Sequence, residues 1–173
     1  MKNNYTQTRI FNYAVADFDG FAELNISYTG SGEHNLLVNN SSCSNIISSN
    51  LNTIKVKTVS LDNFLKSYTN IVDFVKMDIE GSELLALKGM QNIIKNNNKI
   101  KVLMEFNPKC LLKMNCKPAQ IIEMIFNYFN FKVFVIDEFK ISNKGEYFEV
   151  FSKEDILSLL KNEYDYLNLL LKK

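Results

Sequence analysis

The sequence predicts a layered α/β fold with a largely parallel sheet. Apolar runs with the period of strands alternate with runs that have the period of helices, the pattern typical of β-α-β units. The 173 residues suit one folded domain, and no repeat or linker divides them, so we treat residues 1–173 as a single domain. Ligands of such sheets bind just beyond the carboxyl ends of the strands.

The strands and helices follow from local patterns along the chain. The predicted strands cover residues 9–16, 21–28, 54–59, 72–79, 101–106 and 131–136. Residues 164–171 could extend the last helix or form a closing strand, and we favour the strand. A short helix opens near Asp62 as its N-cap, and further helices cover 82–88, 118–129 and a stretch capped by Ser152 with Asp155 as capping-box partner. Residues 29–52 read as a Gly/Ser/Asn-rich loop with an apolar piece at 36–38, and 140–141 with 147–151 as a hairpin.

Composition excludes several classes of protein. Twenty basic and 19 acidic side chains give a net charge of +1, and the basic residues are scattered, so bulk charge does not predict nucleic-acid binding. No apolar run is long enough to cross a membrane, and no signal peptide is visible, so we expect a cytoplasmic protein. Cys43, Cys110 and Cys116 form no C-x-x-C pair, which favours structural thiols over a disulfide framework or a zinc site.

Carboxylates crowd the end of the predicted strand 72–79. Asp78, Glu80 and Glu83 lie within six residues, close to Lys76. Crowded carboxylates repel one another, so one of them acquires a raised pKa or binds a cation, as a general base or a metal ligand does. Strand-to-helix turns also carry such residues for helix capping alone, and spacing does not decide between these interpretations.

The same block resembles a known family. Lys76-x-Asp78-x-Glu80-Gly81-x-Glu83, followed by Leu87-Lys88-Gly89, is similar to the signature of FkbM-type methyltransferases. Weaker similarities surround it at residues 12–17 with Gly20 and Leu24, at 60–64, at 102–105, at 151–152 and at 166–170. The resemblance implies a class I methyltransferase (Rossmann-like) sheet. It also implies S-adenosylmethionine as cofactor and methyl transfer to a hydroxyl group, on a sugar or glycan.

The resemblance also assigns roles to particular residues. Asp78 would lie nearest the transferred methyl group, with Glu80 as a base or second ligand and Glu105 as a third catalytic candidate. Asp17 would contact the adenine end of the cofactor, together with Asp78 as a cofactor-binding residue. The need for a metal stays open. His34, the one histidine, is interpreted as a polar loop residue rather than a base.

One part of the family's pattern does not occur in this sequence. The family's first strand ends in a glycine-rich loop that admits the cofactor, and none of the six glycines here forms G-x-N-x-G or G-x-G-x-x-G. We therefore expect an N-terminally truncated sheet in which strands one and two are missing. A homodimer or a partner chain could supply them. The alternative function is a non-catalytic half-domain, or a gene fragment, that cannot bind cofactor alone. Hydrolase and nucleotide-binding modules are disfavoured, because G-x-S-x-G and P-loop motifs are absent from the sequence.

Overall fold

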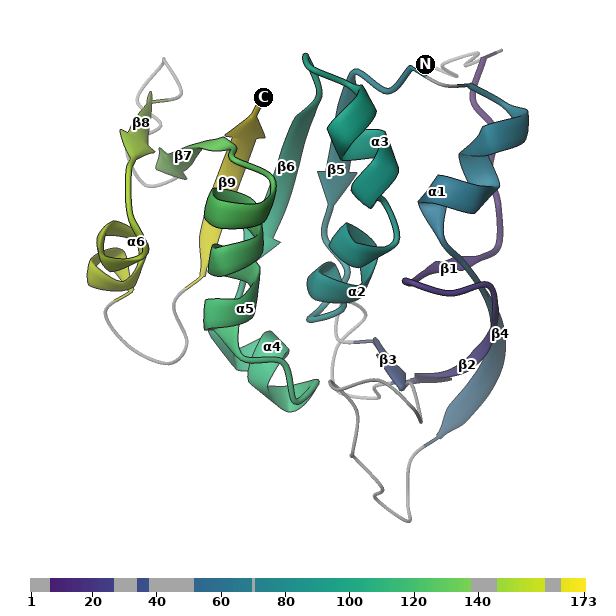
Figure 1. Ribbon diagram of the computed structural model, residues 1–173. Coiled ribbons are helices and arrows are strands. Elements are labelled where there is room, and N and C mark those ends of the chain that lie inside the picture. The colour runs from purple at the N-terminus through teal and green to yellow at the C-terminus, as the bar shows by residue number, and fades with distance from the viewer. Residues whose placement is uncertain (1–6, 27–33, 38–51, 70, 138–145, 161–165) are drawn as a thin grey trace, which may run out of the picture.

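The computed structural model describes residues 7–26, 34–37, 52–69, 71–137, 146–160 and 166–173. The described residues form two separate sheets with helices packed between and in front of them (Figure 1). The mixed α/β class predicted from the sequence is therefore confirmed.

The first sheet, which we call sheet A, has four strands in the order β1-β4-β2-β3. Its strands are β1 (Ala14–Val15), β2 (Gly20–Asn25), β3 (Asn35–Leu37) and β4 (Thr53–Val59). β1 runs parallel to β4, whereas β2 is antiparallel to both β4 and β3. The strand predicted over residues 9–16 is much shorter in the structure, and Ile10 is 91% exposed.

The second sheet, sheet B, has five strands in the order β5-β6-β9-β7-β8. Its strands are β5 (Phe74–Met77), β6 (Lys101–Phe106), β7 (Lys132–Asp137), β8 (Glu146–Val150) and β9 (Leu167–Lys172). β5 and β6 are parallel, and the remaining pairs are antiparallel. The expectation of a largely parallel sheet is wrong, because the closing strand β9 inserts antiparallel between β6 and β7. β8 forms its hairpin with β7, and residues 140–141 of the predicted hairpin lie outside the described residues.

Short helices connect the strands. They are α1 (Leu61–Phe64), the 3-10 turn η1 (Leu65–Ser67), α2 (Glu83–Lys88), α3 (Gln91–Asn96), α4 (Pro108–Lys113), α5 (Pro118–Glu123), the π-helical turn η2 (Met124–Tyr128) and α6 (Lys153–Leu159). Ser152 and Asp155 form the predicted capping box of α6. The N-cap of α1 is Ser60, not Asp62. Asp62 instead accepts the backbone N–H groups of Asn92 and Ile93 at the start of α3, 3.0 and 2.9 Å away.

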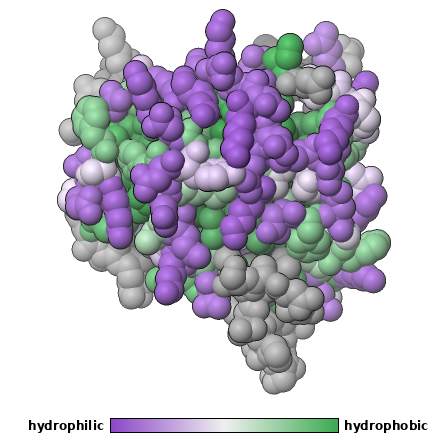
Figure 2. Space-filling view, viewed as in Figure 1, coloured by the Kyte–Doolittle hydropathy of each residue, from purple (hydrophilic) through white to green (hydrophobic). Residues whose placement is uncertain are grey.

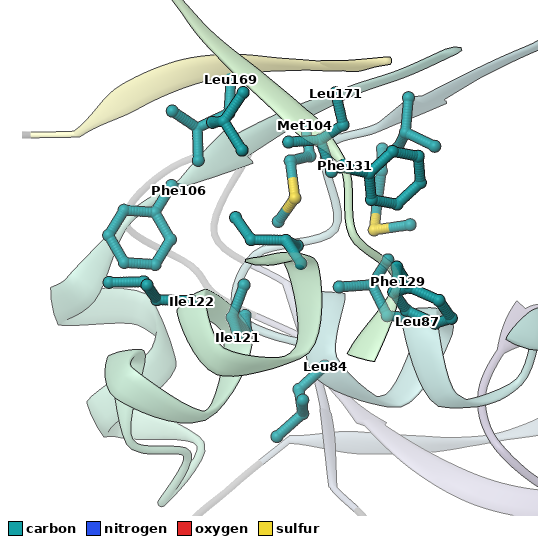
Figure 3. Close-up of a cluster of buried hydrophobic side chains, with 14 of the residues drawn as sticks. Leu84, Leu87, Met104, Phe106, Ile121, Ile122, Phe129, Phe131, Leu169 and Leu171 are labelled. Carbon is teal, nitrogen blue, oxygen red and sulfur yellow. The ribbon is translucent and has the colours of Figure 1, made fainter. Parts of the chain in front are cut away.

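The main core lies between sheet B and the helices α2 to α6. Alternate residues of β6 and β9 point into it, as the two-residue period of a strand requires. Figure 3 shows ten labelled members of this cluster converging from strands and helices: Leu84, Leu87, Met104, Phe106, Ile121, Ile122, Phe129, Phe131, Leu169 and Leu171. The outer surface of the helices is largely hydrophilic (Figure 2).

Helix α2 joins the two sheets. Leu84 and Leu87 belong to the main core, whereas Leu85 packs in a second cluster with Leu36 of β3 and with Ala16, which directly follows β1. Gly89, at the carboxyl end of α2, lies against the backbone of Ala16. This packing fixes where sheet A lies relative to the carboxyl end of β5. Among the described residues, no helix is long and apolar enough to cross a membrane.

Candidate active site

The acidic block forms a tight turn directly after β5. Glu80 has a φ of 53° and Gly81 a φ of 97°. Both values lie in the left-handed region, which residues other than glycine rarely adopt. A Cβ at Gly81 would lie 2.5 Å from the carbonyl oxygen of Cys110 in α4, so only glycine fits there. The turn is thus held in an unusual backbone conformation, which in proteins is often found at functional sites.

Glu83 supports this turn from the inside. It is 3% exposed, and its Oε1 accepts the backbone N–H groups of Ile79 and Gly81, each at 3.3 Å. Burial raises the pKa of its carboxyl. The backbone hydrogen bonds lower this pKa, and the charge of Glu105 raises it further. Glu83 therefore lies beneath the turn rather than at its surface.

Asp78 and Glu105 lie side by side at the ends of two parallel strands. Met77 pairs with Met104, so the next residues, Asp78 and Glu105, come level with each other. Lys76 forms an ion pair with Asp78, with Nζ 2.7 Å from Oδ2. Partial burial raises the pKa of Glu105, and the charges of Asp78 and Glu80 raise it further, against the hydrogen bond donated by Asn107.

Glu80 contacts the helix that follows β6. The thiol of Cys110 donates to Oε2 of Glu80 over 3.4 Å. Burial together with this carboxylate raises the pKa of Cys110 from 9.0 to about 12, so the cysteine is a neutral hydrogen-bond donor. Three of the carboxylates predicted from the sequence, Asp78, Glu80 and Glu105, are therefore brought together.

Asp17 does not join this group. It is exposed and follows β1, where its Cα packs next to Gly89 at the carboxyl end of α2. Asp78 lies before the amino end of the same helix. A helix of six residues separates its two ends by roughly 9 Å, so Asp17 and Asp78 lie at opposite ends of α2.

A cavity of about 290 Å³ opens beside the acidic turn, between sheet A and the start of α2. Its wall includes Asn12, Val15, His34, Leu36, Ile79 and Ser82. Ser82 is 3% exposed, and its Oγ has no hydrogen-bond partner among the described residues. A buried hydroxyl without a partner is costly.

Sequence reasoning missed this cavity. Asn12 was assigned to a strand, His34 to a loop and Ser82 to the start of a helix, where its hydroxyl makes no capping bond. No local signal joins these residues, because they meet only when β3 and β1 pack against α2. No group of three or more His, Cys, Asp and Glu side chains that could hold a metal ion occurs within the described part of the chain.

Acidic side chains at the carboxyl ends of neighbouring parallel strands, next to a ligand-sized cavity, are typical of α/β enzymes. Comparison with known families narrows this broad class of α/β enzymes to one family. Residues 1–167 match the family described as the methyltransferase FkbM domain. Because the match spans nearly the whole sequence, the chain belongs to the FkbM methyltransferase family. No curated protein and no solved structure matches the chain.

Proposed function

We propose that this protein transfers a methyl group from S-adenosylmethionine to a hydroxyl oxygen of a sugar or glycan. The observation that carries the proposal is the acidic turn 78–81 lying next to a cavity with an unpartnered buried hydroxyl. Family membership supports methyl transfer, and the surface carboxylates suit an acceptor with several hydroxyl groups. The alternative of a non-catalytic half-domain is not favoured by the family match.

The residues present fit part of the cofactor. Val15, Leu36 and Ile79 give the cavity apolar walls, which suit a flat heteroaromatic ring, and the hydroxyl of Ser82 can hydrogen-bond to such a ring. A cavity of about 290 Å³ is near the lower limit for small-molecule sites. Asp78 and Glu80 flank Ile79, where their charges suit a sulfonium cation and ribose hydroxyls. When bound, S-adenosylmethionine supplies an electrophilic methyl group.

The clustered carboxylates have different roles in the proposed reaction. The acceptor hydroxyl must lose a proton as it reacts, and a base works best when its pKa is close to the working pH. Glu105, whose pKa is raised, is the best suited of the three to hold that proton. Asp78 is placed to orient the reacting groups, and Lys76 forms an ion pair with it.

Two open sheet edges support a role for a further polypeptide segment. Among the described residues β5 pairs only with β6, and β1 pairs only with β4. In Figure 1 sheet A lies on the β5 side of sheet B. Apolar side chains near these edges are exposed, with Ile10 at 91%, Ile71 at 71% and Phe74 at 53%. We propose that a strand of a second polypeptide pairs with the open edge of β5 and completes the cofactor site.

Calorimetric titration with S-adenosylhomocysteine tests the cofactor assignment. We expect a micromolar dissociation constant, about −8 kcal/mol at 1 μM, either for the chain alone or at concentrations where sedimentation shows self-association. Asp78→Asn should weaken binding and reduce turnover, whereas Asp73→Asn, at the opposite end of β5, should leave both unchanged. A folded chain that does not bind S-adenosylhomocysteine in either state contradicts cofactor binding by this chain.

A further inference from the structure

The turn that carries Asp78 and Glu80 is unfavourable by itself. A non-glycine residue in the left-handed region costs about 1–2 kcal/mol, and Glu80 adopts this conformation with φ 53°. The following residue, Gly81, is confined between the turn and the backbone of α4. Something in the surrounding structure must therefore stabilise this conformation over more extended ones.

Glu83 accepts two hydrogen bonds that can form only in this turn conformation. Its Oε1 lies 3.3 Å from the backbone nitrogens of both Ile79 and Gly81, so one oxygen accepts from both sides of Glu80. In an extended chain these two N–H groups would point to the same side but lie roughly 6.6 Å apart, so one side-chain oxygen could not accept from both. The two hydrogen bonds thus select the turn conformation.

A carboxylate is an expensive choice for this position. Glu83 is 3% exposed, and among the described residues it has no ion-pair partner. Burial raises its pKa, and the neighbouring Glu105 raises it further. Its retention in a buried place is explained if the geometry of its hydrogen bonds matters more than its charge.

We propose that Glu83 is a positioning residue, which holds the turn 78–81 in its left-handed conformation so that Asp78 and Glu80 face the ligand. It does not touch the ligand itself. This inference rests on the proposed cofactor site, but its effect on the turn can be measured without any ligand. Because both hydrogen bonds end on one oxygen, an amide oxygen can replace the carboxylate.

Three variants separate this role from general stability. Glu83→Gln keeps an acceptor at the same reach and should retain the turn. Glu83→Asp is one methylene shorter and should lose at least one of the two bonds, and Glu83→Ala loses both. Glu123→Ala is the control, since Glu123 is an exposed glutamate of α5 and not part of the acidic turn.

Hydrogen exchange measured by NMR is the first test. We expect the Ile79 and Gly81 amides to exchange at least about tenfold faster in Glu83→Asp or Glu83→Ala, the change that loss of a roughly 1.4 kcal/mol interaction produces. Amides of Val102 and Leu171 in sheet B should keep their protection factors relative to global stability, and Glu83→Gln should resemble the parent. Unchanged exchange at Ile79 and Gly81 in both shortened variants overturns the proposal.

Titration with S-adenosylhomocysteine is the second test. Glu83→Asp should weaken binding by about tenfold or more, and Glu83→Gln should restore it to within about threefold of the parent. Equal binding by parent and Glu83→Asp, with the turn amides deprotected, would reduce Glu83 to a purely structural role and refute the proposal. If the parent does not bind S-adenosylhomocysteine, the proposed function fails, and the exchange data alone decide whether Glu83 holds the turn.

Discussion

The backbone of Gly89 packs directly against the backbone of Ala16, which brings the carboxyl end of α2 into contact with sheet A. A Cβ at position 89 would overlap the carbonyl oxygen and carbon of Ala16 and approach Cα of Asp17 to 3.3 Å. All of these are main-chain atoms, which cannot turn aside as a flexible side chain can. The close packing of α2 against the end of β1 therefore depends on the absence of a side chain at Gly89.

Gly89→Ala is expected to destabilise the protein. The backbone must shift to admit the methyl group, at a cost of about 1–3 kcal/mol. Urea unfolding followed by circular dichroism measures this loss. Lys88→Ala, one residue earlier and partly exposed, is the control and should change stability by less than about 0.5 kcal/mol. Equal stability of Gly89→Ala and the parent would show that the backbone at this contact admits a methyl group without cost.

Asp62→Ala is expected to destabilise helix α3. The carboxylate of Asp62 accepts two backbone N–H groups and the side-chain amide of Asn92, all within 3.0 Å. Loss of such a cap costs about 1–2 kcal/mol. Asp62→Asn keeps one acceptor oxygen and should lose roughly half as much, measured in the same urea titration. The interpretation of Asp62 as a cap fails if both variants are as stable as the parent.

Cys110 is expected to react slowly with thiol reagents in the folded protein. A pKa of about 12 in place of 9.0 lowers the thiolate fraction near pH 8 by about a thousandfold. Reaction with 5,5′-dithiobis(2-nitrobenzoate) in a Cys43→Ser, Cys116→Ala background measures this rate, and unfolding in urea should restore the ordinary one. Glu80→Gln removes the charge that helps to raise the pKa of Cys110, so this variant should react faster than the parent. An unchanged rate in Glu80→Gln would show that the Glu80 carboxylate does not raise the pKa of Cys110.

Glu105→Gln should change the pH dependence of stability. The pKa of Glu105 is raised above 4.5 in the folded state, so the folded protein holds this proton more tightly than the unfolded chain. Ionising Glu105 therefore lowers the free energy of unfolding as pH rises from about 4.5 through its higher native pKa. Glu105→Gln removes this loss of stability. The free energy of unfolding of the variant minus that of the parent should therefore increase across this pH range and stay constant above it. Urea unfolding at pH values from about 3 to 8 would reveal a difference that shrinks with rising pH if the sign is wrong.

Local patterns predicted most of the elements of this fold. Strands β4, β6 and β7, helix α5 and the capping box of α6 lie where hydrophobic period and capping residues placed them. The pairing of strands could not be predicted in the same way. β9 reads as a closing strand from its sequence, but its antiparallel insertion between β6 and β7 depends on contacts across the whole of sheet B.

The candidate site was predicted in part for the same reason. Asp78, Glu80 and Glu105 follow or end parallel strands, and the rule for parallel strands brings their side chains together. The role of Glu83 could not be read from spacing, because its buried contacts depend on the left-handed backbone at Glu80 and Gly81. Asp17 was assigned by resemblance alone, and the structure places it at the far end of α2 from Asp78.

The place of β9 in sheet B has a consequence for how the protein is made. Of the five strands, β9 comes latest in the chain, yet it separates β6 from the β7–β8 hairpin. During synthesis on the ribosome, the hairpin and the β5–β6 pair emerge first, and neither can form hydrogen bonds with the other. Until residues 167–172 have left the exit tunnel, their apolar faces and inner edges are open to other chains. Exposed apolar surface and unpaired strand edges of this kind make a partly folded chain prone to aggregation.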